Sequence, residues 1–145
     1  MNESRNYKYR DDIATADAAF EAWGDTEEEM IIASANALMN VMVENLDSIG
    51  IKERRILHVE AESIDMLLFH LLEELVYLKD AERLLLRVSK VHLVQENDRM
   101  ALDAAVYGEG IDPGKHELNV DVKAVTMHRF GVKQSDNVWR ATVVL

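Results

Sequence analysis

The stretch SIDMLLFHLLEELVYL at residues 63–78 decides the fold. Ser63 is a favourable N-cap residue, because its hydroxyl accepts a hydrogen bond from a main-chain N–H in the first turn of a helix. The apolar residues that follow recur every three or four positions, which places them on one face. We therefore predict an amphipathic helix that begins after Ser63 and buries this face. The face consists of Ile64, Leu67, Leu68, Leu71, Leu72, Leu75 and Leu78.

A second helix is predicted upstream by the sequence TEEE at residues 26–29. In such a capping box the Thr26 hydroxyl accepts from the Glu29 amide, while the Glu29 carboxylate accepts from the amide of Thr26. Apolar residues then recur at helical spacing, and we expect the helix to end by residues 48–50. Its apolar stripe consists of Ile31, Ala35, Leu38 and Met42, widened by Ile32, Met39 and Leu46.

Most of the remaining sequence alternates between polar and apolar residues, as half-buried strands do. The phase changes between Val88 and Val91, which predicts a bulge, and residues 95–98 and 134–137 are typical hairpin turns. Two amphipathic helices covering one face of a mainly antiparallel sheet bury these patterns most simply, so we predict an α+β two-layer sandwich. The predicted strands span residues 20–24, 55–61, 84–94, 100–106, 122–132 and 139–145.

The length and composition predict a single domain over residues 1–145. The formal net charge of −11 disfavours direct binding of nucleic acid, because a protein that follows phosphates needs a basic face. The absence of cysteine excludes thiol nucleophiles, thiolate zinc sites and disulfides. We find neither a signal-peptide core nor an apolar run of the ~20 residues that span a bilayer, so we expect a soluble, cytoplasmic protein that does not bind membranes.

Standard catalytic motifs are absent: the sequence contains no phosphate-binding loop, no dinucleotide-binding glycine motif, no HExxH and no nucleophile elbow. We therefore predict no catalytic and no cofactor-binding residue. His58, His70 and His92 are expected to be surface residues, whereas His128 is expected to be a hydrogen-bonded core residue. For His116, which follows a glycine-bearing loop, the residues favour a loop-anchoring role over a functional one.

Three carboxylates, Asp11, Asp12 and Asp17, lie within seven residues of one another together with the Thr15 hydroxyl. Such hard oxygen ligands suit Ca²⁺ or Mg²⁺, although the spacing is not that of an EF-hand loop. A full Ca²⁺ shell of ~6–8 oxygens needs more ligands than these. The residues alone favour the alternative of a turn in which Asp17 accepts hydrogen bonds from main-chain amides.

Three blocks of the sequence resemble the archease family: TADAAFEAWGDTEE at residues 15–28, KHELNVDVKAVTMH at 115–128 and WRATVV at 139–144. The second block is the most specific of the three. Two shorter blocks, LMNVM at 38–42 and VEAES at 59–63, fit in order and spacing. The resemblance extends over about residues 7–145, which is nearly the whole chain.

The resemblance implies a small cytoplasmic protein that activates a GTP-dependent tRNA-splicing RNA ligase of the RtcB type. The ligase would perform the catalysis, so this protein is expected not to be an enzyme, while it promotes guanylylation and multiple turnover of the ligase. The family binds a divalent cation, usually calcium, through the aspartate of an HTAD motif and acidic groups at the extreme C-terminus. The resemblance thus assigns Asp17 as a metal ligand. Lys115 and His116 are expected to help contact the ligase, since they lie beside a long loop.

The sequence departs from the family pattern in two places. The motif histidine is replaced by Ala14, and an acidic residue common before it is replaced by Ile13. The family also carries an Asp-containing pair after the last strand, where this sequence reads only to Leu145. Asp12 or the Leu145 carboxylate would have to substitute as a cation ligand.

Two other functions remain open at this point. A general chaperone or protein-interaction module without ligase specificity fits the same acidic domain. A metal-dependent hydrolase centred on Asp11, Asp12 and Asp17 would need a general acid or base and a second carboxylate cluster, and the sequence identifies neither.

Overall fold

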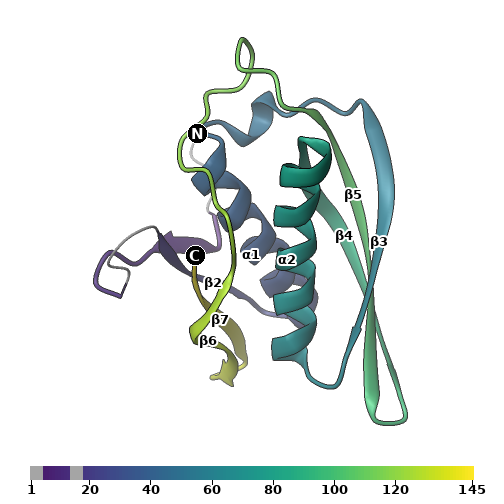
Figure 1. Ribbon diagram of the computed structural model, residues 1–145. Coiled ribbons are helices and arrows are strands. Elements are labelled where there is room, and N and C mark those ends of the chain that lie inside the picture. The colour runs from purple at the N-terminus through teal and green to yellow at the C-terminus, as the bar shows by residue number, and fades with distance from the viewer. Residues whose placement is uncertain (1–4, 14–17) are drawn as a thin grey trace.

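The computed structural model describes residues 5–13 and 18–145. Within them the strands form two antiparallel sheets, one with the order β1-β2-β7-β6 and the other with the order β3-β5-β4 (Figure 1). The elements are β1 (Tyr7–Tyr9), β2 (Ala19–Gly24), α1 (Glu27–Met42), the 3-10 helix η1 (Leu46–Ser48), β3 (Glu53–Ala61), α2 (Ile64–Glu82), β4 (Leu84–Glu96), β5 (Arg99–Gly110), β6 (Thr126–Ser135) and β7 (Val138–Val144).

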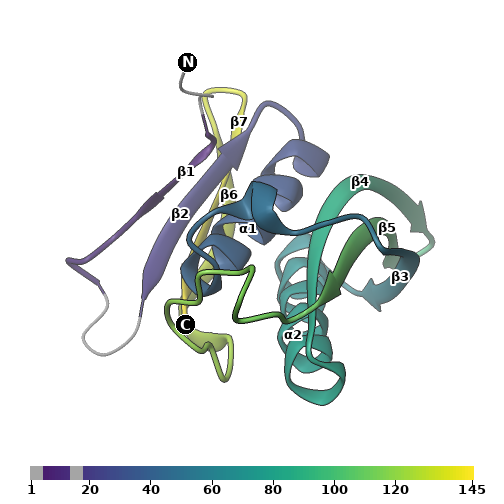
Figure 2. The same cartoon turned by 90° about the horizontal axis from the view of Figure 1, so that it is seen from above.

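Helix α1 lies between the two sheets and packs against β2 of one and β4 of the other (Figure 2). Helix α2 packs against β3 and β4, and its Phe69 meets Phe130 of β6 edge-on, with the ring centroids 5.2 Å apart. Leu38 of α1 and Leu72 of α2 are fully buried. The predicted α+β class, with two amphipathic helices packed on antiparallel strands, is confirmed.

The structure differs from the expectation in dividing the strands between two sheets. The first long strand, β2, pairs with the last one, β7, and Ala19 lies opposite Val144. Alternation of polar and apolar residues shows which face of a strand is buried but not which strand is its neighbour. Alternation therefore predicts a single sheet as readily as two, whereas in the structure α1 packs on both β2 and β4 and separates two sheets.

The signals at the N-terminal ends of both helices are confirmed. Thr26 Oγ1 accepts from the Glu29 N–H at 3.1 Å, and Glu29 Oε1 accepts from the Thr26 N–H at 3.2 Å. At the start of α2 the Ser63 hydroxyl accepts from the N–H of Met66 at 3.3 Å, as an N-cap without the reciprocal bond. Helix α1 ends at Met42, earlier than expected, because Val43 turns into an extended conformation and forms a bridge with a distant segment of the chain.

Both predicted hairpin turns are confirmed, and so is the bulge, where the register of β4 shifts between Val88 and Lys90. In the β6–β7 turn Asp136 and Asn137 have φ values of 54° and 64°, a left-handed conformation that Asn and Asp tolerate. Strand β6 begins later than predicted, and the three-residue β1 was not predicted at all.

Candidate functional site

The predicted metal ligand Asp17 lies in residues 14–17, outside the described residues. The residue after it, Ala18, precedes β2, and its carbonyl oxygen accepts a hydrogen bond from the N–H of Leu145 at 2.8 Å. This bond continues the β2–β7 ladder by one residue. The far end of the described chain therefore lies directly beside the residue that follows Asp17.

The two carboxylates upstream of Asp17 differ in their surroundings. Arg10 holds Asp12 through two hydrogen bonds, from Nε to Oδ1 at 2.8 Å and from Nη2 to Oδ2 at 2.6 Å. This bidentate contact lowers the pKa of Asp12 to about 2. Asp11 is exposed and lines a shallow pocket of about 460 Å³ together with Ala18 and Glu44. Asp11 is thus the more available of the two carboxylates, because Asp12 is already bound to Arg10.

In residues 5–13 and 18–145, no three His, Asp or Glu side chains are grouped so that they could hold a metal ion. The predicted role of Asp17 as a ligand remains a prediction.

The loop after β5 is anchored on the carboxylate of Glu109, which is only 3% exposed. Its Oε2 accepts from Lys115 Nζ at 2.7 Å, from the Gly50 N–H at 2.6 Å and from His116 Nε2 at 2.9 Å. Nδ1 of His116 accepts from the Asp112 N–H, so Nε2 carries the donated proton. The ion pair with Lys115, the Gly50 amide and His116, in that order, lower the pKa of Glu109 to about 2.

A buried lysine of α2 holds the extended segment between β5 and β6. Lys79 Nζ donates to Asp80 and Asp121, each at 2.5 Å, and to the Val122 carbonyl oxygen at 2.7 Å. These three bonds use all three donors of the ammonium group. On its other side the segment bonds to the end of α1, where the Asn119 N–H donates to the Met42 oxygen at 2.8 Å. The segment is therefore fixed between the two helices.

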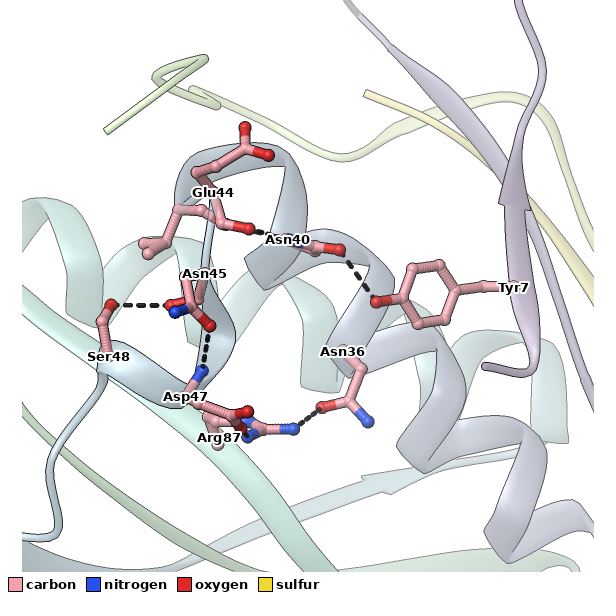
Figure 3. A network of polar contacts seen from close by, with 9 residues as sticks. Tyr7, Asn36, Asn40, Glu44, Asn45, Asp47, Ser48 and Arg87 are labelled. Carbon is pink, nitrogen blue, oxygen red and sulfur yellow. Dashed lines mark hydrogen bonds and ion pairs between the residues drawn. The ribbon is translucent and has the colours of Figure 1, made fainter. Parts of the chain in front are cut away.

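A polar cleft of about 680 Å³ lies along α1, and we call it the α1 cleft. Asn40 organises its upper end (Figure 3). Its Oδ1 accepts from the Tyr7 hydroxyl at 2.9 Å, and its Nδ2 donates to the carbonyl oxygens of Val43 and Glu44, both at 3.0 Å. Asn40 thereby closes the C-terminal end of α1 and ties it to β1. The α1 cleft is lined in part by Arg5, Tyr7, Asn36, Asn40, Asp47 and Arg87.

Arg87 reaches from β4 into the α1 cleft, where its contacts are long (Figure 3). Nη2 donates to Asn36 Oδ1 at 3.3 Å, and Nη1 lies 3.5 Å from Asp47 Oδ1. The buried Nε has no hydrogen-bond partner within the described residues. Sequence reasoning missed this site, because its polar residues come from distant elements and form no motif.

Residues 7–145 match the family model of the archease protein family. Proteins named archease from Pyrococcus furiosus and Pyrococcus abyssi are 40% and 39% identical to this chain over 131 residues, which is 90% of this chain and 92% of each relative. This chain belongs to the archease family. Its resemblance to the family in sequence is thereby confirmed.

Two solved structures resemble this archease. The solution structure of protein 1598 from Methanobacterium thermoautotrophicum has a TM-score of 0.84 at 31% identity and covers 97% of both chains. The crystal structure of an archease from Thermotoga maritima, described as a possible chaperone, has a TM-score of 0.56 and covers 93% of this chain and 94% of its own. At 19% identity the second likeness shows the fold alone.

Lys115 and His116, the two residues expected to contact a partner, differ in how exposed their side chains are. Lys115 is partly exposed, with 42% of its side chain accessible, whereas His116 is 1% exposed. The burial of His116 supports the anchoring role that the residues favoured. Contact of Lys115 or His116 with a partner remains a prediction. No helix in the described part of this archease is long and apolar enough to cross a membrane.

The other histidines are at the surface or partly exposed. His58 lies between Asp103 and Glu60, at 2.6 and 2.8 Å, and hydrogen bonds to Glu60 and then to Asp103 raise its pKa. The prediction that His128 is a core residue is wrong, since its side chain is exposed. The regular pairing of β6 with β7 is interrupted between Thr126 and Gly131, so the expected alternation does not hold there.

Proposed function

We propose that this archease activates a GTP-dependent tRNA-splicing RNA ligase of the RtcB type in the cytoplasm. The ligase performs the chemistry, and the archease promotes guanylylation of the ligase and its multiple turnover without being an enzyme itself. A divalent cation, calcium in this proposal, binds at Asp17 and at oxygen groups near the end of β7. The observation that supports the proposal is the hydrogen bond between Ala18 and Leu145, because it joins the residue after Asp17 in the sequence to the residue after β7.

The residues around this bond fit a calcium site in part. Asp11 lines the same pocket as Ala18 and offers an exposed carboxylate, the ligand type that Ca²⁺ prefers. Asp12 is a poor ligand, because recruiting it would break two hydrogen bonds to Arg10. Bound calcium would supply positive charge at an otherwise acidic surface. In the proposal Asp17 and Asp11 hold that charge where the ligase docks, and electrostatic complementarity speeds the encounter.

The test is ligase guanylylation and multiple-turnover RNA joining with and without the archease. We expect Asp17→Ala to abolish most of the stimulation and to lower calcium affinity about ten-fold or more in calorimetry, since it removes a principal charged ligand. Asp98→Ala is the matched control, because it removes an equal charge from the exposed β4–β5 turn. Unchanged calcium isotherms for Asp17→Ala would refute the cation site. Absence of stimulation by the wild-type archease of a cognate ligase would refute the function.

A second candidate is a general chaperone, since the Thermotoga maritima archease is described as a possible chaperone. Exposed apolar side chains such as Leu118 and Val120, on the segment that Lys79 anchors, would contact unfolded clients in that case. A chaperone suppresses aggregation of unrelated proteins, whereas a dedicated activator acts only on the ligase. Light scattering by a heat-denatured client that is not an RNA ligase distinguishes the two.

A further inference from the structure

Arg87 in the α1 cleft uses only a small part of its hydrogen-bonding capacity. A guanidinium carries five N–H donors in a planar fork that matches a carboxylate. Here two donors make contacts of 3.3 and 3.5 Å, at or beyond the upper limit for strong N–H···O bonds, and Nε has no partner. The Arg87 side chain is 20% exposed, so an incoming group can reach it.

The carboxylates that line the α1 cleft differ in how firmly they are held. Glu29 accepts from the amides of Asp25 and Thr26 in the capping box, and Glu44 accepts from Asn119 at 2.8 Å. Asp47, in contrast, is 89% exposed and touches Arg87 only at 3.5 Å. Its own carboxylate makes no other bond within the described residues. Asp47 is therefore a weakly held carboxylate on an arginine with unused donors.

We propose that the α1 cleft binds an acidic segment of a partner protein, in which an Asp or Glu carboxylate replaces Asp47 on the Arg87 guanidinium. The exchange leaves the charge next to Arg87 unchanged, because Asp47 swings into solvent as the incoming carboxylate arrives. The partner carboxylate gains the two parallel hydrogen bonds that Asp47 does not make. This inference goes beyond the proposed ligase activation and does not depend on it.

The dimensions of the cleft favour a peptide segment over a free small acid. The cleft extends along α1 from Glu29 to Asn40, about 16 Å at 1.5 Å per helical residue, which is the length of about five extended residues. The side-chain amides of Asn36 and Asn45 line the cleft, and their NH₂ groups have no acceptor in the described residues. Main-chain carbonyls of a bound peptide supply such acceptors.

The charge of the molecule favours a carboxylate over a phosphate. A phosphate group carries nearly two negative charges into a cleft that already contains Glu29, Glu44 and Asp47, on a chain with a net charge of −11. A single carboxylate that displaces Asp47 into solvent leaves the charge beside Arg87 unchanged. We therefore assign the site to an acidic peptide rather than to a terminal phosphate group.

The probe is a terminally blocked peptide of roughly seven residues with one central aspartate. In a heteronuclear NMR titration of the full chain, we expect the Arg87 Nε–H resonance to shift and to saturate. The same peptide with asparagine in the central position should bind about five-fold more weakly or worse, because a charge-assisted pair becomes a neutral one. Equal binding of the two peptides, or an Arg87 Nε–H signal that stays in place while other signals shift, would overturn the proposal.

Two variants test the exchange. Arg87→Lys keeps the positive charge but loses the planar pair of N–H donors that binds a carboxylate. We therefore expect the aspartate peptide to bind about ten-fold more weakly. Asp47→Asn removes the internal competitor and should tighten binding about two- to five-fold, the strength of a weak exposed ion pair. The matched control Asp98→Asn removes the same charge far from the cleft and should leave the affinity unchanged.

Equal effects of Asp47→Asn and Asp98→Asn would show general electrostatics and would refute displacement of Asp47. Inorganic phosphate that shifts Arg87 at lower concentration than the peptide would refute the peptide assignment. Thermal melts establish whether Arg87→Lys is folded. If it is not, the wild-type Nε–H shift and the two aspartate variants decide the question.

Discussion

Glu109 is a buried carboxylate that stays ionised because three donors converge on it. Lys115 and His116 come from the loop that the carboxylate anchors, and the Gly50 amide comes from the segment before β3. The sequence showed that His116 follows a glycine-bearing loop but could not show which group it binds. Glu109 shares no motif with His116, and only the fold brings the two together.

We expect Glu109→Gln to lower the free energy of unfolding by about 1–3 kcal/mol at neutral pH, since the hydrogen bonds to an ionised acceptor become weaker neutral ones. The pKa of Glu109 falls from 4.5 to about 2 on folding. In that interval the unfolded chain binds a proton that the folded chain does not, so wild-type stability should fall as the pH drops from about 4.5 to about 2. Urea unfolding at several pH values measures both effects.

The exposed Glu62→Gln is the control for loss of one charge, and its effect should stay within about 0.5 kcal/mol. A Glu109→Gln variant with the same acid dependence as the wild type would show that this carboxylate does not link folding to pH.

At the scale of elements, the sequence predicted correctly those helix starts and turns that depend on residues close together in the chain. The capping box at Thr26, the N-cap at Ser63 and the two hairpin turns depend on residues three or four positions apart, so the sequence alone identified them. Strand β1 was missed, because its three residues are stabilised by pairing with β2 rather than by their own pattern. The end of α1 was placed too late for a similar reason, since Val43 pairs with Leu118 from a distant part of the chain.

We expect Thr26→Ala to destabilise the protein by about 1 kcal/mol, because the N–H of Glu29 loses its acceptor at the start of α1. Thr26→Ser keeps the hydroxyl and should lie close to the wild type. Chemical denaturation of both variants measures the difference. Equal losses for alanine and serine would mean that the methyl group of Thr26, and not its cap, matters.

At the scale of the molecule, α1 is shared by the two sheets (Figure 2). The sequence predicted that this helix is buried but not that it has a sheet on each side, because a stripe of apolar residues does not reveal how many partners cover it. The polar residues of the α1 cleft are likewise brought together only by the fold. A motif match assigned Asp17, whereas the α1 cleft assembles Arg87, Asn36 and Asp47 from β4, α1 and η1 and has no signature along the chain.

We expect Leu38→Ala to cost about 2–5 kcal/mol, since it opens a cavity at a fully buried position of α1. Because α1 packs on β2 of one sheet and β4 of the other, amide protection in hydrogen exchange should fall in both strands. Ile51→Ala shortens a side chain that is 58% exposed and should have little effect. Protection lost in only one sheet would mean that the two sheets unfold separately.

The bond between Leu145 and Ala18 has a practical consequence for binding experiments. An affinity tag fused after Leu145 would emerge directly beside Ala18, the residue that follows Asp17 in the sequence. A histidine-rich tag there would bring its own metal ligands to the proposed cation site and would obstruct the proposed approach of the ligase. Titrations with calcium and assays with RNA are therefore best made on protein without a carboxyl-terminal affinity tag.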